Sequence, residues 1–282
     1  MKAFYLAESG VEMISTYIFI NRLRYDRLRY DYARDKTASR LVAAFDQEFF
    51  DRVPVEAAAR LDRVSCLEPF NHQTLSQLIA EEVALAGSPD RIKLICWEED
   101  ALLLCGRIRR EFNIPGPTEI DLSVYRNKID MKKKLMEAGI RVPRFVTAEM
   151  LASTNSPKKL MSQIAAYVGF PLIVKPIDGM GALETYKICD QTALLAFIED
   201  HRDELLSWNF EEFIQGNIFH CDTFFHEGEP VFVGVGKHVG SPLAYVNGQT
   251  RCTIVVEPES DEWHQIKAFN EKVLESPAVS QL

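Results

Sequence analysis

The chain has 282 residues, of which 47% are apolar and 26% are charged, a composition typical of proteins that fold around packed cores. Its formal net charge of −9 argues against the broad basic surface that binds nucleic acid, although a cleft for a small anion stays open. The arginine-rich stretch at residues 21–35 also contains aspartates, so we interpret it as a solvated helix face rather than a nucleic-acid arm. No run approaches the ~18 consecutive apolar residues that span a bilayer, and we expect no membrane segment.

The N-terminal residues and the cysteines favour a cytoplasmic location. Glu8 and Glu12 interrupt the apolar residues of the N-terminus, so we interpret KAFYL as a first strand and not as part of a signal peptide. The six cysteines form no CxxC pair, and their spacing resembles neither a zinc site nor a disulfide framework. Cys66, Cys96 and Cys189 stand in or beside apolar strand-like runs, where cysteine usually acts as a small buried hydrophobe. A reducing compartment fits this pattern.

Strand and helix patterns alternate over residues 1–116. The predicted strands are KAFYL, RVSCLEPF and RIKLICW. The predicted helices are NHQTLSQLIAEEVALAG, which Gly87 ends, and EEDALLLCGRIRREFNI, which ends before Pro115-Gly116-Pro117. Strands that alternate with helices of this length predict a parallel sheet.

The pattern restarts after the Pro-Gly-Pro sequence. Helices are predicted over VYRNKIDMKKKLMEAG, SPKKLMSQIAAYV, TALLAFIEDHRDELLS and DEWHQIKAFNEKVLES. Strands are predicted in GFPLIVKPIDGMGALETYKI, as a strand–loop–strand unit, in WNFEEFI, and in a hairpin over residues 221–239 with its turn at Gly228. This second part therefore mixes helices with short strands and hairpins, which differs from the simple alternation of the first part.

Lys175 occupies an unusual position in the strand–loop–strand unit. It follows the apolar run Leu172-Ile173-Val174, where an ammonium group is costly unless an anion meets it. Gly179 and Gly181 follow in the loop, and glycines let backbone N–H groups approach a phosphate closely. The arrangement is not a Walker motif, because the lysine precedes the glycines. This motif by itself is compatible with two interpretations, a polyphosphate site and a purely structural turn.

Two further segments favour the polyphosphate interpretation. Lys128 lies at the start of a predicted helix and supplies a second cation. The sequence EEFIQG ends a predicted strand, whose backbone groups can hold a nucleobase by its edge. Taken in order, NKIDMKKKLMEAGIRVP, GFPLIVKPIDGMGALET and EEFIQG resemble the ATP-grasp family, in the carboxylate–amine ligase branch that includes biotin carboxylase and the carbamoyl-phosphate synthetase-like proteins. The resemblance covers residues 98–222 well and the first 97 residues more loosely.

The resemblance implies an α/β protein with three parts. A parallel α/β (pre-ATP-grasp) domain is expected over residues 1–116, a small ATP-grasp α+β lobe with a glycine-rich lid over 123–206, and a second lobe over 207–282. In the family, carboxylates on two strands beyond the last predicted helix hold magnesium. Because the sequence ends shortly after that helix, we expect the last lobe to be truncated and the Mg²⁺ ligands to be largely absent. Glu257 is the single acidic residue nearby on a strand-like run.

The resemblance also implies roles for individual residues. Lys128 and Lys175 would bind the phosphates of ATP, and residues 179–182 would form the lid. The backbones of Glu212 and Ile214 would pair with adenine, with Glu211 nearby. The residues so assigned to ATP are Lys128, Lys175, Gly179, Met180, Gly181, Ala182, Glu211, Glu212, Phe213, Ile214 and His220. His220 and Asp222 match a segment that flanks the cleft, although His220 is equally well explained as a solvent-facing strand residue.

Other charged residues are given simpler interpretations. Lys132, Lys133 and Lys134 are interpreted as a solvated helix face, and Lys237 and His238 as hairpin residues that either line the cleft or have no chemical role. Three positions depart from the family pattern: Ala182 stands where serine is common, Ile218 where a glutamate often meets the ribose, and Asn127 where aspartate is frequent. These departures predict a weaker nucleotide site.

Three hypotheses follow for function. The first is ATP-dependent ligation of a small-molecule carboxylate to an amine through an acyl phosphate, by a cytoplasmic and homo-oligomeric enzyme. The second is a catalytically weak or inactive nucleotide-binding protein that lacks the strands holding magnesium. The third is a structural α/β protein that binds no nucleotide. The sequence identifies neither the carboxylate nor the amine, and we assign no catalytic residue from it.

Overall fold

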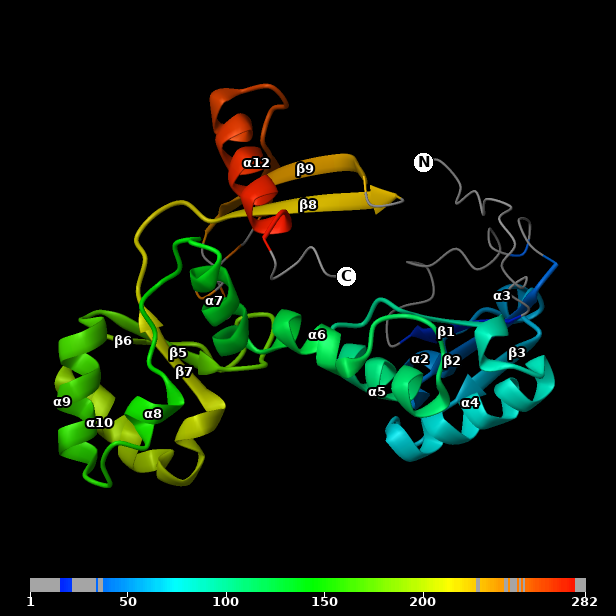
Figure 1. Cartoon of the computed structure of the whole chain (residues 1–282), viewed down its shortest axis with the longest axis horizontal. Helices are drawn as coiled ribbons and strands as arrows, with labels where there is room; N and C mark the ends of the chain where they lie inside the picture. The colour runs from blue at the N-terminus through cyan, green and yellow to red at the C-terminus, as the bar shows by residue number, and fades with distance from the viewer. Residues whose placement is uncertain are drawn as a thin grey trace. The chain divides into compact units, whose positions relative to one another are not determined.

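The computed structural model describes residues 16–21, 34, 38–226, 229–240, 243, 248, 250 and 252–276. It divides the chain into two compact units, Met1–Ser123 and Val124–Leu282, whose elements are labelled in Figure 1. The predicted strand KAFYL and most of the arginine-rich stretch lie outside the described residues.

Four parallel strands form the sheet of the first unit within its described part. Their order is β3-β2-β1-β4, with bounds β1 (Thr16–Asn21), β2 (Arg40–Phe45), β3 (Arg63–Cys66) and β4 (Ile92–Cys96). The parallel α/β architecture expected from the sequence is confirmed. The two central strands, β1 and β2, were not predicted, whereas β3 and β4 were. β3 ends at Cys66, short of the predicted Phe70, and Pro69 has no N–H to extend the ladder.

Helices cover this sheet and bury its apolar side chains. They are α2 (Gln47–Phe50), α3 (Val55–Ala58), α4 (His72–Ala86), the 3₁₀ turn η2 (Pro89–Arg91) and α5 (Leu102–Phe112). The Asn71 side chain accepts a hydrogen bond from the Thr74 N–H and caps α4, and Gly87 ends that helix with a φ of 80°. Ile18 and Val42 of the sheet pack with residues of α4 and α5 in one fully buried cluster.

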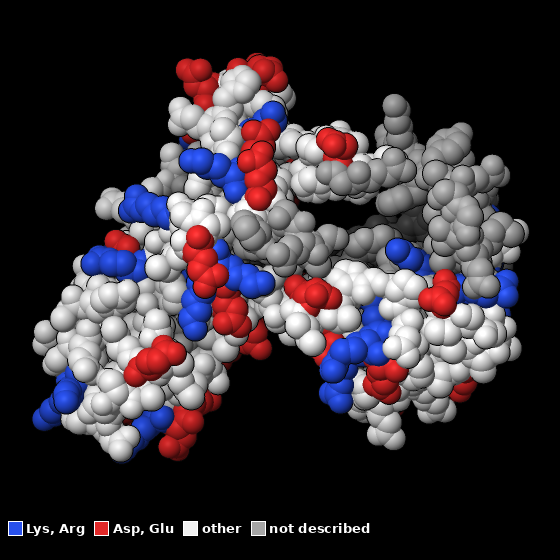
Figure 2. Space-filling view, in the orientation of Figure 1, with Lys and Arg blue, Asp and Glu red and all other residues white. Residues whose placement is uncertain are grey.

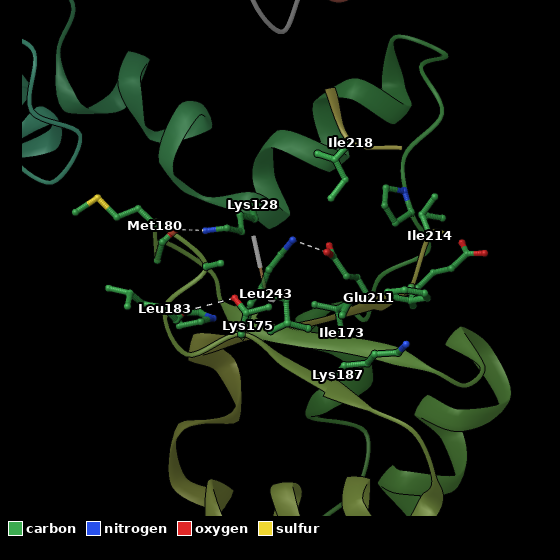
Figure 3. A pocket seen from close by; sticks show the side chains of 18 of the residues that line it. Lys128, Ile173, Lys175, Met180, Leu183, Lys187, Glu211, Ile214, Ile218 and Leu243 are labelled. Atoms are coloured by element: carbon green, nitrogen blue, oxygen red, sulfur yellow. Dashed lines mark hydrogen bonds and ion pairs between the residues drawn. The ribbon is translucent and has the colours of Figure 1, made fainter. Parts of the chain in front are cut away.

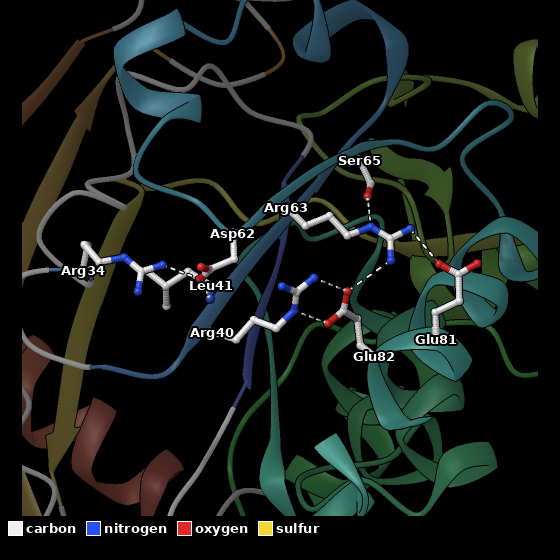
Figure 4. Close-up of polar contacts among 8 residues, drawn as sticks. All are labelled: Arg34, Arg40, Leu41, Asp62, Arg63, Ser65, Glu81 and Glu82. Atoms are coloured by element: carbon white, nitrogen blue, oxygen red, sulfur yellow. Dashed lines mark hydrogen bonds and ion pairs between the residues drawn. The ribbon is translucent and has the colours of Figure 1, made fainter. Parts of the chain in front are cut away.

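A buried carboxylate joins α4 to the sheet (Figure 4). Glu82 is fully buried, and its oxygens accept hydrogen bonds from Arg40 Nε at 2.8 Å, Arg40 Nη2 at 3.1 Å and Arg63 Nη1 at 3.1 Å. Arg40 begins β2 and Arg63 begins β3, so the carboxylate holds the starts of two neighbouring strands against one helix. Asp62, directly before β3, accepts a hydrogen bond from the Leu41 N–H of β2 at 2.7 Å and forms an ion pair with Arg34.

The second unit begins with helices and a small sheet. The helices are α6 (Glu119–Arg126), which contains the boundary between the units, α7 (Lys128–Glu137), α8 (Ala148–Leu151), α9 (Pro157–Val168), α10 (Gln191–Asp200) and η3 (Arg202–Ser207). The strands of its first described sheet are antiparallel, in the order β6-β5-β7, with bounds β5 (Leu172–Pro176), β6 (Tyr186–Ile188) and β7 (Trp208–Glu212). Figure 1 shows α9 and α10 on one side of this sheet and α7 on the other. Leu172, Val174 and Phe210 form its buried face with α9 and α10.

A second antiparallel sheet follows in the described residues, in the order β10-β9-β8. It contains β8 (Phe219–His226), β9 (Glu229–Val239) and β10 (Cys252–Val255), and α12 (Asp261–Leu274) contacts β8 and β9. The two strands of the predicted hairpin and the last helix are therefore confirmed, whereas the turn predicted at Gly228 lies outside the described residues. Gly236 leaves room for the His220 ring, which would lie 2.2 Å from a Cβ at that position and would have to shift.

Two surface properties bear on the expectations from composition. In the described part of the chain, no helix combines the length and the apolar character needed to cross a membrane. On the face drawn in Figure 2, the described Lys and Arg side chains intermingle with Asp and Glu.

Candidate functional site

A cavity of about 680 Å³ lies in the second unit, beside the carboxyl end of β5 (Figure 3). Its lining comes from the start of α7, from β5 and β6, from the loop between these two strands, and from the end of β7 with the residues after it. The lining residues are Lys128, Pro143, Ile173, Lys175, Pro176, Gly179, Met180, Gly181, Ala182, Leu183, Thr185, Lys187, Glu211, Glu212, Phe213, Ile214, Gln215, Gly216, Asn217, Ile218 and Leu243.

Lys175 meets its anion inside this cavity. Its ammonium group forms an ion pair with the Glu211 carboxylate, which β7 brings alongside β5. The Glu211 side chain is 8% exposed and that of Lys175 is 25% exposed, so the pair lies at the cavity wall and is only partly open to water. The cost of a lysine at the end of a buried strand is thus offset by a carboxylate on the neighbouring strand.

Lys132 reaches the same carboxylate from α7. Its side chain is 5% exposed, and its ammonium group pairs with Glu211 and donates a hydrogen bond to Asn209 Oδ1 at 3.2 Å. Asn209 Nδ2 donates to the same Glu211 oxygen at 2.8 Å. The interpretation of Lys132 as part of a solvated helix face is therefore wrong, whereas Lys133 and Lys134 are exposed as expected. The Lys128–Lys132 spacing of four residues places both lysines on one helix face, and this signal was available in the sequence.

The two ammonium groups determine the charge state of Glu211. Burial alone would raise the pKa of this carboxyl, but Lys175 and then Lys132 outweigh burial and hold the pKa below its ordinary value. Burial lowers the pKa of Lys132, and the attraction of Glu211 offsets that effect only in part. At neutral pH Glu211 is therefore a carboxylate, shared by two lysines.

The loop between β5 and β6 is held by two cations, Arg126 at the end of α6 and Lys128 at the start of α7. Lys128 Nζ donates hydrogen bonds to the carbonyls of Gly179 and Ile177, and its backbone N–H donates to Ile177 O at 2.9 Å. Arg126 donates to the carbonyl of Asp178. Gly181 has a φ of 65°, in the left-handed region that favours glycine. Lys128 and this loop therefore close one end of the cavity (Figure 3).

Asn127 caps α7, the helix that carries Lys128. Its side-chain oxygen accepts hydrogen bonds from the N–H groups of Ile129 and Asp130 at 2.9 and 3.2 Å. The predicted helix from Val124 is consequently divided at Asn127 into α6 and α7.

The opposite part of the cavity is more apolar. Ile173, Ile214 and Ile218 contribute aliphatic side chains, and the Lys187 ammonium lies 4.2 Å from the centre of the Phe213 ring. The chain leaves β7 beside these residues, where the Glu212 N–H donates to Arg144 O at 2.8 Å and its carboxylate pairs with the Arg144 side chain. One end of the cavity is thus cationic and the other apolar, which suits a ligand with phosphates at one end and a flat ring at the other.

Comparison with known proteins finds similar ligases and synthetases. No protein-family model matches the chain. The L-arginine-specific L-amino acid ligase of Bacillus subtilis is 28% identical over 191 residues, which are 63% of this chain and 42% of that ligase. The solved L-amino acid ligase of Bacillus licheniformis superposes with a TM-score of 0.66 at 16% identity, over 93% of this chain and 60% of that structure. N5-carboxyaminoimidazole synthetase of Staphylococcus aureus, complexed with ADP, superposes with a TM-score of 0.61 at 15% identity. The superposition covers 95% of this chain and 65% of that structure.

The chain is therefore similar in sequence to an L-amino acid ligase, and it has the fold of these solved ligase and synthetase structures. It spans less than half the length of the curated ligase and about 60% of the solved one. The mixed architecture, a parallel sheet followed by antiparallel sheets, is that of these ATP-grasp structures.

The structure brings together nearly all residues that the ATP-grasp resemblance assigned to ATP. All of them line the cavity except His220, which lies on β8 with its ring 5.0 Å from that of His238 and 3.6 Å from Asp222. Lys237 pairs with Glu262 of α12 at 2.8 Å and does not line the cavity. Ile218 does line it, at the position where the family often has glutamate.

Several lining residues were not predicted. Ile173 belongs to β5, Thr185 directly precedes β6, and Lys187 belongs to β6. Ile173 pairs directly with Lys187 across the two strands. Alternation along the two strands offers a signal for them, because side chains two apart share a face. Lys187 in particular adds a cation to the apolar end, which no motif of the sequence indicated.

The described residues contain no preformed cluster of metal ligands. Within them, no group of three His, Cys, Asp or Glu side chains lies close enough to hold a metal ion. Glu257, the carboxylate singled out for this role, is exposed. We therefore assign no residue of this chain to magnesium.

Proposed function

We propose that this chain binds ATP in the cavity, as the nucleotide-binding part of an enzyme that ligates a carboxylate to an amine. The observation that carries the proposal is the cavity itself, whose cationic end combines Lys128, Lys175 and a glycine loop and whose apolar end lies beside the end of β7. The ADP complex of the Staphylococcus aureus neighbour supports it as an analogy of fold.

In this proposal the triphosphate occupies the cationic end. Lys175 and Lys128 contact phosphate oxygens as point charges, and N–H groups of residues 179–182 close over them. Adenine lies between the aliphatic side chains and Phe213, with its edge toward the backbone of residues 212–214. The absence of a glutamate at Ile218 removes one candidate partner for the ribose.

The proposed reaction has two displacements. A carboxylate oxygen attacks the γ-phosphorus of ATP, the bond to the β-phosphate oxygen breaks, and ADP leaves an acyl phosphate behind. The amine nitrogen then attacks the acyl carbon, phosphate leaves, and the amine loses a proton. The residues of this chain contribute charge and positioning to the first step. Because one relative is named for L-arginine, amino acids are the first carboxylates and amines to test.

A second candidate is a nucleotide-binding protein with little turnover of its own. It is favoured by the lack of a metal-binding cluster among residues that the structure describes. Both candidates include a cytoplasmic location and a homo-oligomer as further proposals.

Titration with a fluorescent ADP analogue, mant-ADP, tests nucleotide binding. Saturable binding that ATP displaces is expected, and its absence would contradict both candidates. A coupled assay for ADP release, screened over pairs of amino acids with magnesium present, then separates them. Amino-acid-dependent release supports the ligase, and binding without release supports the second candidate.

A further inference from the structure

Two lysines share one carboxylate behind the cationic end of the cavity. Glu211 pairs with Lys175 through one oxygen and with Lys132 through the other. Among the described residues, the neighbouring carboxylate of Glu212 pairs with Arg144, and Lys128 lies near enough to help lower the pKa of Lys132. The group of Lys132, Glu211 and Lys175 therefore has a net charge of +1, which a partly buried site tolerates best when an external anion is present.

The two lysines differ in what they can reach. Lys175 lines the cavity, whereas Lys132 does not, and it contacts Glu211 from α7. The Lys132 ammonium also lies 5.1 Å from the centre of the buried Phe145 ring and hydrogen-bonds Asn209. Lys132 is thus fixed in the protein and contacts no ligand in the cavity, while Lys175 faces it (Figure 3).

This arrangement decides how much positive charge the cavity presents. If Glu211 had Lys175 as its sole partner, the carboxylate would neutralise that ammonium and repel a phosphate. Because Lys132 neutralises Glu211 from behind, the charge of Lys175 stays available to an anion. Lys132 also keeps Glu211 paired when Lys175 turns toward the anion, which avoids an unpaired buried carboxylate.

We propose that Lys132 is a positioning residue for phosphate binding, which acts through Glu211 to leave the charge of Lys175 available to the nucleotide. This inference rests on the proposed function, because it requires a phosphate ligand in the cavity. It assigns to Lys132 an effect on affinity without any contact between Lys132 and the ligand.

Three variants test it in the full chain. Lys132→Met removes the rear charge and keeps an apolar stem of similar length. Lys132→Met combined with Glu211→Gln removes both buried charges and leaves Lys175 unopposed. Lys133→Met is the matched control, because Lys133 is the exposed neighbour on the same helix. Circular dichroism and the melting temperature establish that each variant is folded.

The readouts are the Kd of mant-ADP and the concentration of inorganic tripolyphosphate that displaces it. Tripolyphosphate has no adenine. Its affinity therefore measures binding at the cationic end of the cavity alone, even if Glu211 also contacts the base of a nucleotide. We expect Lys132→Met to weaken the binding of tripolyphosphate roughly tenfold, because the loss of one partly screened charge has an effect of this size. We expect the double variant to return to near the wild-type value, and Lys133→Met to leave it unchanged.

The outcomes are distinguishable. Wild-type affinity in Lys132→Met overturns the inference while leaving the proposed function intact. A double variant as weak as Lys132→Met also overturns it, because a merely structural lysine would not be rescued by loss of its partner. Failure of the wild-type chain to bind mant-ADP and tripolyphosphate overturns the proposed function itself.

Discussion

Replacement of Lys175 by methionine removes the cation that faces the cavity and keeps most of its aliphatic stem. The fold should tolerate the change, because Glu211 remains paired with Lys132 and hydrogen-bonded to Asn209. Loss of a charge that contacts phosphates typically costs ~2–4 kcal/mol. Lys175 is 25% exposed and shared with Glu211, so water and the carboxylate screen part of its charge. We therefore expect the lower half of that range, which corresponds to about 30- to 150-fold weaker ATP binding.

The assay is displacement of mant-ADP by ATP, compared among the wild type, Lys175→Met and Lys133→Met. The control removes the same charge from an exposed position on α7 and should bind ATP as the wild type does. Urea unfolding establishes that the three proteins are folded, with a somewhat lower midpoint expected for Lys175→Met because Glu211 loses one of its two ion pairs. Equal ATP affinities for Lys175→Met and Lys133→Met, with both proteins folded, would refute the assignment of Lys175 to phosphate.

Three predictions concern stability and pH. Glu82→Gln should destabilise the first unit by about 1–3 kcal/mol in urea unfolding, less than for a fully buried ion pair because the Arg40 side chain is 33% exposed; an unchanged midpoint would contradict this. Gly106→Ala should cost about 1–3 kcal/mol despite the better helix propensity of alanine, because its Cβ would lie 2.4 Å from the backbone nitrogen of Glu119; a more stable variant would show that this contact relaxes freely. The lowered pKa of Glu211 means that its charged form stabilises the fold above the ordinary value of 4.5, and that this contribution is lost as pH falls through the folded-state pKa below 4.5. Glu211→Gln should therefore show a shallower loss of stability between about pH 5 and pH 3 than the wild type, and identical slopes would be evidence against the ion pairs.

Local patterns in the sequence were sufficient to predict most helices and strands of the second unit. The helix α9 is capped by Ser156 before Pro157 and by Gly169 after Val168, and the glycine loop follows β5 as predicted. These features depend on neighbours along the chain, such as caps and alternating apolar residues. The motifs around Lys128 and Lys175 were likewise local, and the structure places both in one cavity.

The failures concern interactions between distant residues. Lys132 stands in a run of three lysines, and nothing nearby indicates that its partner lies 79 positions later. The central strands β1 and β2 were overlooked for a related reason. β1 is buried at nearly every position, so it has no alternation of apolar and polar residues, and its short apolar run is not distinctive without the sheet around it.

Hydrogen–deuterium exchange of the wild-type chain, with and without ADP, tests the central claim most directly. Nucleotide in the cavity should slow exchange of the backbone N–H groups of residues 179–183 and 212–216, which lie at its two ends. Residues of α4, in the first unit, serve as the internal reference and should exchange at the same rate in both samples. Slower exchange confined to the two cavity segments is the result that our account predicts. Saturating ADP that leaves both segments unchanged, or that protects residues elsewhere instead, would contradict it.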